Sequence, residues 1–243
     1  MSEPENWSPL GRLLEEISWE GSIPAGYRRG GRGMENVLTT QVMQALDYLP
    51  RADFLRSVFR DAVGADGARA AAARACTSLR LTLLPPELQL PPTRLAVQPD
   101  ATWTDDSVYV LVEAKRIGSS RFQPQQLVRE YVGVVQECAG RVPLLLLVLG
   151  AEPPILVQGE GRTSVRDAIA QGLPALAETV RPLPESVDEL LAGIDARVAW
   201  TTWARIRERV AANASSAETR YGTETVIRLA GDLVRAVDWH GST

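Results

Sequence analysis

Residues 98–116 read QPDATWTDDSVYVLVEAKR, and this stretch decides the fold that we expect. Two arms, residues 93–103 and 108–115, are rich in β-branched and apolar residues, and a polar turn at residues 104–107 separates them. This pattern predicts a β-hairpin. The second arm ends in Glu-Ala-Lys, which is a poor end for a strand that has only a structural role.

Side chains of a strand alternate between its two faces. The second arm therefore places Leu111, Glu113 and Lys115 on one face. If a two-residue loop joins the arms, Asp100 pairs with Leu111 and lies diagonal to Glu113, about 7–8 Å away. Any loop of even length keeps the three charged residues on the same side of the sheet. Two carboxylates this close repel each other, so the pattern predicts a metal ion beside them.

The structural alternative is a surface hairpin with a cross-strand salt bridge, worth about 0.2–1 kcal/mol. Residues 108–112 are apolar on both faces of the strand, as in a buried strand. A solvated ion pair does not belong on such a strand, so we favour a functional site.

The rest of the chain alternates predicted helices and strands. Before residue 161, helical patterns cover about 34–49, 52–63, 66–76 and 124–138, and strand patterns cover 79–84, 143–149 and 155–159. After it, helices are expected at 164–180, 186–196, 199–212 and 217–239, the first two capped by serines and the first broken near Gly172 and Pro174. We expect an α/β or α+β fold in which helices flank a mixed sheet. Residues 1–161 would form the main domain and residues 162–243 a helical C-terminal extension.

Composition limits the chemistry. A net charge of −4 excludes a uniformly basic surface but leaves room for a local basic cleft. The single histidine, His240, is near the C-terminus, where we expect fraying, so histidine-based triads and zinc sites are disfavoured. Carboxylate and carbonyl ligands would favour Mg²⁺, Mn²⁺ or Ca²⁺. No secretory signal or membrane-spanning run is visible, and we expect a cytoplasmic protein.

Two further candidates precede the hairpin. Glu35 lies on the apolar stripe of the helix predicted at 34–49, and a metal at the sheet would give this acid a partner. The alternative is an acid that the helix dipole favours in the first turn. Arg28, Arg29 and Arg32 lie just before it in a glycine-rich loop, where they either keep the loop soluble or bind phosphates.

The spacing of the charged residues resembles a known pattern. Pro-Asp at 99–100 is followed by Glu-Ala-Lys at 113–115, with thirteen positions from the aspartate to the glutamate. This resembles the PD-(D/E)xK nuclease superfamily, over about residues 34–150. The resemblance implies a restriction-endonuclease-like core with the order αβββαβ.

The resemblance also implies roles for individual residues. Asp100 and Glu113 would be metal ligands, together with the backbone carbonyl of Ala114. Lys115 would be the catalytic lysine, and Glu35 would bind the metal directly or support its ligands. Mg²⁺ or Mn²⁺ would be the cofactor.

Some members of that superfamily carry a glutamine and a tyrosine on the following helix, with three residues between them. Here four residues separate Gln126 from Tyr131, so the sequence departs from that motif. Gln126 is kept as a candidate contact to nucleic acid, although both residues also fit an ordinary helix.

The sequence thus predicts a metal-dependent nuclease that hydrolyses DNA, with RNA not excluded, in phage defence or in DNA repair. Cutting both strands of a duplex calls for two active sites, which a homodimer or a protein partner bound through the C-terminal helices would provide. One alternative is a nuclease-like module that binds nucleic acid or a protein without cutting. The other is an adaptor whose C-terminal helices are the working surface.

Overall fold

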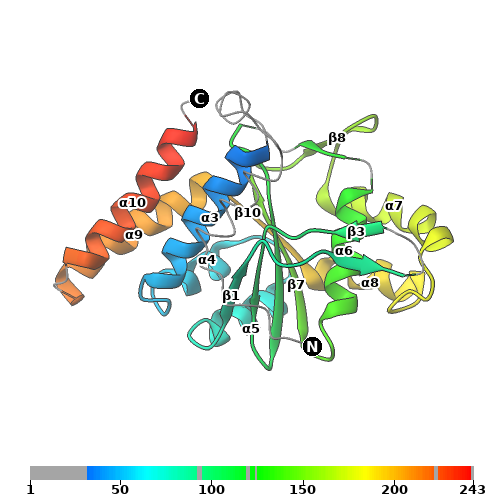
Figure 1. Cartoon of the computed structure of the whole chain (residues 1–243), viewed down its shortest axis with the longest axis horizontal. Helices are drawn as coiled ribbons and strands as arrows, with labels where there is room; N and C mark the ends of the chain where they lie inside the picture. The colour runs from blue at the N-terminus through cyan, green and yellow to red at the C-terminus, as the bar shows by residue number, and fades with distance from the viewer. Residues whose placement is uncertain (1–31, 92–94, 119–120, 124, 222–223, 242–243) are drawn as a thin grey trace.

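The structure is a computed structural model that describes residues 32–91, 95–118, 121–123, 125–221 and 224–241. Side chains are described for these residues except 32–35 and 217–221. A mixed sheet lies in the middle of the molecule and helices cover both of its faces (Figure 1). The predicted fold class is therefore confirmed.

The central sheet has five strands within the described residues. In spatial order they are β1 (Arg80–Leu83), β4 (Ala101–Thr104), β5 (Val108–Ala114), β7 (Val142–Leu149) and β10 (Val198–Thr202). β4 is antiparallel to both of its neighbours, β1 and β5. β7 is parallel to β5, and β10 is parallel to β7. A parallel pair needs a crossover connection, which α6 (Gln126–Glu137) provides between β5 and β7.

Two apolar cores lie on the two faces of this sheet. The first joins the valines of β5 to helices α3 (Arg32–Tyr48), α4 (Leu55–Asp61), α5 (Asp66–Ala75), α9 (Trp203–Tyr221) and α10 (Glu224–Gly241). The second joins Tyr109 and Leu111 to α6, α7 (Val165–Thr179) and α8 (Val187–Arg197). Figure 1 shows α3, α9 and α10 on one side of the sheet and α6, α7 and α8 on the other. β5 is buried at every residue because both faces are covered, as its apolar sequence predicted.

The predicted first arm of the hairpin is divided. β3 (Leu95–Val97) pairs with β2 (Leu88–Leu90) in a separate two-stranded sheet, and only β4 pairs with β5. Residues 98–100 connect β3 to β4. Pro99 lies in this connection, and its lack of a backbone N–H makes it unsuited to a continuous ladder. The predicted continuous arm from 93 to 103 was therefore wrong.

The two-residue loop that we assumed for the register does not form. Thr104 pairs with Tyr109, so four residues form the turn. The Asp105 carboxylate accepts hydrogen bonds from the backbone N–H groups of Ser107 and Val108, at 2.8 and 2.9 Å, which stabilises this longer turn. Four is still an even number, so the predicted facing of Asp100 is retained.

A third small sheet contains β6 (Arg121–Phe122), β8 (Ile155–Val157) and β9 (Gly161–Thr163). β6 is parallel to β8, and β9 is antiparallel to β8. The strand predicted at 155–159 therefore forms, but in this small sheet and not in the central one.

The C-terminal segment is not entirely helical. The predicted helix from 199 to 212 begins instead at Trp203, because Val198–Thr202 forms β10 on the edge of the central sheet. The serine caps of α7 and α8 are confirmed, but α7 runs through Pro174 without a break. α10 packs against α3 and so joins the first core. The domain boundary after residue 161 stays a prediction.

None of the helices in the described ranges is both long enough and apolar enough to cross a membrane.

Candidate functional site

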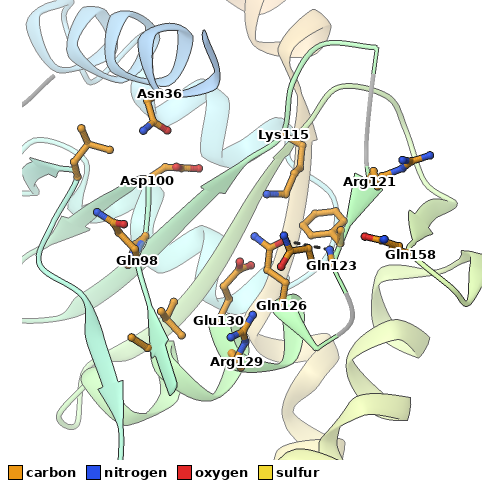
Figure 2. Close-up of a pocket in the computed structure, with 15 residues that line it drawn as sticks. Asn36, Gln98, Asp100, Lys115, Arg121, Gln123, Gln126, Arg129, Glu130 and Gln158 are labelled. Atoms are coloured by element: carbon orange, nitrogen blue, oxygen red, sulfur yellow. Dashed lines mark hydrogen bonds between the residues drawn. The ribbon is translucent and has the colours of Figure 1, made fainter. Parts of the chain in front are cut away.

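A cavity of about 440 Å³ lies at the carboxyl end of β5. Its lining includes Ala96 and Val97 of β3 and Arg121 and Phe122 of β6. The polar side chains that line it include Asn36, Gln98, Asp100, Lys115, Gln126 and Glu130 (Figure 2). The carboxyl ends of parallel strands are common places for ligands in α/β proteins.

Asp100 is fixed beside the end of β5. Its Oδ2 atom accepts a hydrogen bond of 2.7 Å from the backbone N–H of Ala114, and its own N–H donates to the carbonyl of Val112 at 3.2 Å. The N–H and C=O of one strand residue point to the same lateral side. The carbonyl of Ala114 therefore also faces the side on which Asp100 lies.

Glu113 and Lys115 form a buried ion pair, with 4% and 9% of each residue exposed. Lys115 Nζ donates to Oε1 of Glu113. Gln126 Nε2 donates a second hydrogen bond, of 2.6 Å, to the same oxygen. Lys115 Nζ lies 5.0 Å from the centre of the Phe122 ring. The predicted facing of Glu113 and Lys115 is confirmed, since both project on the face covered by α6.

The backbone of Lys115 is held on two sides. Its N–H donates to the carbonyl of Val148 on β7 at 2.7 Å. Its carbonyl accepts a hydrogen bond of 2.6 Å from the indole Nε1 of Trp203, which is buried at the start of α9. The segment after β10 thus helps to fix the position of this lysine.

Glu130 is a residue of the cavity that we did not predict. It lies on α6 one turn after Gln126, is 3% exposed, and its Oε2 has no hydrogen-bond partner among the described residues. Burial raises the pKa of Glu130 well above its usual value, and the charge of Glu113 raises it further, while Lys115 lowers it in part. Acidic groups therefore outnumber the lysine at the floor of the cavity.

The sequence did contain a signal for Glu130. It falls among the buried apolar residues of α6, such as Leu127 and Val134, as Glu35 falls on the stripe of α3. An acid on the apolar side of a helix needs a partner or a function. The same reasoning that selected Glu35 would have selected Glu130.

Gln126 and Tyr131 have separate surroundings. Gln126 lines the cavity, whereas the hydroxyl of Tyr131 donates to the carbonyl of Leu190 at 2.6 Å, in the core between α6 and α8. The residue that follows Gln126 with three residues between them is Glu130. Tyr131 is therefore a structural residue here.

The remaining candidates precede the described side chains. Arg28 and Arg29 lie outside the described residues, while Arg32 and Glu35 belong to α3 but their side chains are not described. The next residue, Asn36, lines the cavity, so the first turns of α3 lie next to the site.

We had expected His240 to lie in a frayed tail, and this was wrong. It belongs to α10 and is 7% exposed. The apolar side of α10 packs on the first core, and this packing keeps the last turns of the helix folded. His240 does not line the cavity.

The donor atoms of the cavity suit a hard cation. They are the carboxylate oxygens of Asp100, which lines the cavity, and of Glu113, which lies beside it, together with the carbonyl of Ala114. Mg²⁺ prefers oxygen ligands. No three carboxylate, histidine or cysteine side chains gather closely enough to hold a metal by themselves in the part of the chain with described side chains. Mg²⁺ usually binds one or two carboxylates and keeps several waters, so this donor set fits it.

Comparison with known proteins identifies no relative of this chain. No family model matches the chain, and neither a curated protein nor a solved structure matches it. A function therefore has to follow from the residues of the cavity.

Proposed function

We propose that this chain is a Mg²⁺-dependent nuclease that hydrolyses phosphodiester bonds of DNA in the cavity at the end of β5. One observation carries the proposal. Asp100 and Lys115 line this cavity, and Glu113 lies beside it, paired with Lys115 and hydrogen-bonded to Gln126. Lys115 is the only lysine in the 243 residues. Every other cationic side chain except His240 is an arginine.

The choice of lysine at this position has a chemical reason. An arginine stays protonated in proteins, whereas the pKa of a buried lysine shifts readily and lets it exchange a proton. Lysine is also a compact point charge on a flexible stem. A chain that uses arginine elsewhere thus has lysine where a proton transfer is proposed.

Each residue would have a distinct task. Asp100, Glu113 and the carbonyl of Ala114 would hold Mg²⁺ or Mn²⁺, which polarises the phosphate and lowers the pKa of a bound water. Lys115 would orient that water, accept its proton or balance the charge that develops on the phosphate. Gln126 would keep the Glu113 carboxylate in place through its hydrogen bond of 2.6 Å.

The test is cleavage of supercoiled plasmid and of single-stranded DNA, with Mg²⁺ or Mn²⁺ and with EDTA. We expect metal-dependent cutting by the wild type, its loss in Asp100→Ala and Lys115→Ala, and its retention in Asp188→Ala. Asp188 is an exposed acid on α8 that does not line the cavity. Circular dichroism would check that all variants fold. Equal cutting by all proteins would indicate contamination and would contradict the proposal.

A second candidate is a module that binds nucleic acid without cutting it. Glu113 and Lys115 neutralise each other, and one Glu113 oxygen already accepts hydrogen bonds from two groups. Binding of DNA or RNA by the wild type, with no cutting of either in Mg²⁺ or Mn²⁺, would favour this candidate. Cutting of RNA alone would keep the mechanism and change the substrate.

A further inference from the structure

We propose that Arg121 and Arg129 form a phosphate-binding subsite that holds the nucleic-acid backbone next to the phosphate that is cut. The inference rests on the proposed function, because it takes a nucleic acid as the ligand of the cavity. It adds the residues that bind the strand and the chemistry by which they do so.

The first argument is the pairing of the arginines. Arg121 and Arg129 line the cavity, and neither forms an ion pair with any side chain that the structure describes. By contrast, three arginines of α9 are each paired with an acid: Arg205 with Glu152, Arg207 with Asp238 and Arg209 with Asp61. No described acid offsets the charge of the two cavity arginines, and their place at the cavity distinguishes them from other unpaired arginines such as Arg74.

The second argument is their arrangement. Figure 2 shows Arg129, Gln126, Gln123 and Arg121 following one another along one side of the cavity, while Asp100 lies across from them. The backbone N–H of Gln123 donates to the Gln126 side chain at 3.4 Å, which connects the middle of this row. Lys115 lines the same cavity as this row.

The third argument is the charge of the floor. Asp100 and Glu130 line the cavity, and Glu113 offsets the charge of Lys115, so the floor offers a phosphate no excess of positive charge. A polyanion therefore needs cations at the margin of the cavity to stay bound. Arginine suits this task, since its planar guanidinium donates two parallel hydrogen bonds to a phosphate.

The cavity favours recognition of the backbone and not of the bases. Phe122 is the only aromatic residue among the described residues that line it, and it is 1% exposed beneath Lys115. Proteins that grip single strands usually stack the bases on exposed aromatic rings. With no such ring, binding through the two arginines should not depend on sequence.

The test is binding of fluorescently labelled DNA by the full chain in EDTA, measured by anisotropy over a range of salt concentrations. Single and double variants Arg121→Ala and Arg129→Ala are compared with Arg74→Ala. Arg74 is an exposed arginine on α5 with no ion pair to a described side chain, and it does not line the cavity. Arg129→Lys keeps the positive charge and serves as the conservative variant. Thermal melting of every variant shows whether it has folded.

Each alanine substitution should weaken DNA binding several-fold. It should also reduce the magnitude of the slope of log K, the association constant, against log salt concentration by about 0.7–0.9. Both effects should be equal for DNA of unrelated sequences. Arg74→Ala should leave both unchanged. A double variant that binds as the wild type does, a loss that depends on sequence, or no binding by the wild type would overturn the subsite.

The binding assay and the cutting assay can fail independently of each other. A wild type that cuts, with a double variant that binds normally, would remove the subsite and keep the nuclease. A wild type that never cuts, with a double variant that binds weakly, would keep the subsite and remove the nuclease.

Discussion

The two faces of β5 are equally covered but differ at the carboxyl end of the strand. One face carries valines and ends at Ala114, all packed in the first core. The other begins with Tyr109 and Leu111 and then turns polar at Glu113 and Lys115. A single strand thus contributes an unbroken apolar layer to one side and a buried ion pair to the other.

This difference separates stability from chemistry. Removing two charges from water costs several kcal/mol per ion, roughly, and an apolar pair of similar size is often as stable or more so. The ion pair at the end of β5 is therefore weak support for the fold and a better candidate for function. Substitutions on the apolar face should cost stability, and those on the polar face should cost activity.

The largest effect is expected for Lys115→Arg. The substitution keeps a positive charge, but an arginine stays protonated in proteins and cannot take the proposed proton, so cutting should fall by about 100-fold or more. The cutting rate with Mg²⁺ and the melting temperature would be measured together. Lys115→Met, which removes the charge at similar length, is the control for steric effects. Normal cutting by Lys115→Arg would leave Lys115 with a role in charge balance alone.

The apolar face should respond in the opposite way to Val110→Ala. Val110 is fully buried in the first core, and the loss of its two methyl groups should lower the free energy of unfolding by about 1.5–3 kcal/mol. Denaturant unfolding measures this loss. Cutting per folded molecule should be unchanged, and a large loss of activity without a loss of stability would contradict the division between the two faces.

Trp203→Phe tests the link between the faces. The indole of Trp203 packs in the first core, and its Nε1 donates to the carbonyl of Lys115. Its replacement leaves a buried carbonyl without that donor, at a cost of about 1–3 kcal/mol. We expect a moderate loss of cutting as well, because Lys115 is held less firmly. Unfolding and cutting should therefore change together, and unchanged values for both would show that the hydrogen bond has no importance.

The alternation of side chains along a strand predicted the central charged residues of the candidate site. Asp100, Glu113 and Lys115 could be placed on one side of the sheet from sequence, since an even loop of any length gives the same facing. The exact partner of Asp100 could not, because the turn length depends on how Asp105 caps its neighbours. Trp203 could not be linked to Lys115 either, since 88 positions separate them and only the folded sheet brings them together.

The smallest effect is expected for Glu130→Gln, which removes the acid whose Oε2 has no hydrogen-bond partner among the described residues. The folded chain holds the Glu130 proton to a higher pH than the unfolded chain, where its pKa is near 4.5. The unfolded state therefore releases this proton first as the pH rises, and the wild type loses stability above about pH 4.5 until the folded-state pKa is passed.

The glutamine variant has no such loss, so its stability relative to the wild type should be greater at pH 8 than at pH 4. Denaturant unfolding of both proteins at several pH values, without added metal, measures this difference. Leu127 of the same helix supplies a comparison, since Leu127→Ala should be destabilising at every pH. A glutamine variant that is less stable at pH 8 would mean that ionised Glu130 has a partner in solution, and the polar face would then contain a second ion pair in place of an excess of acid.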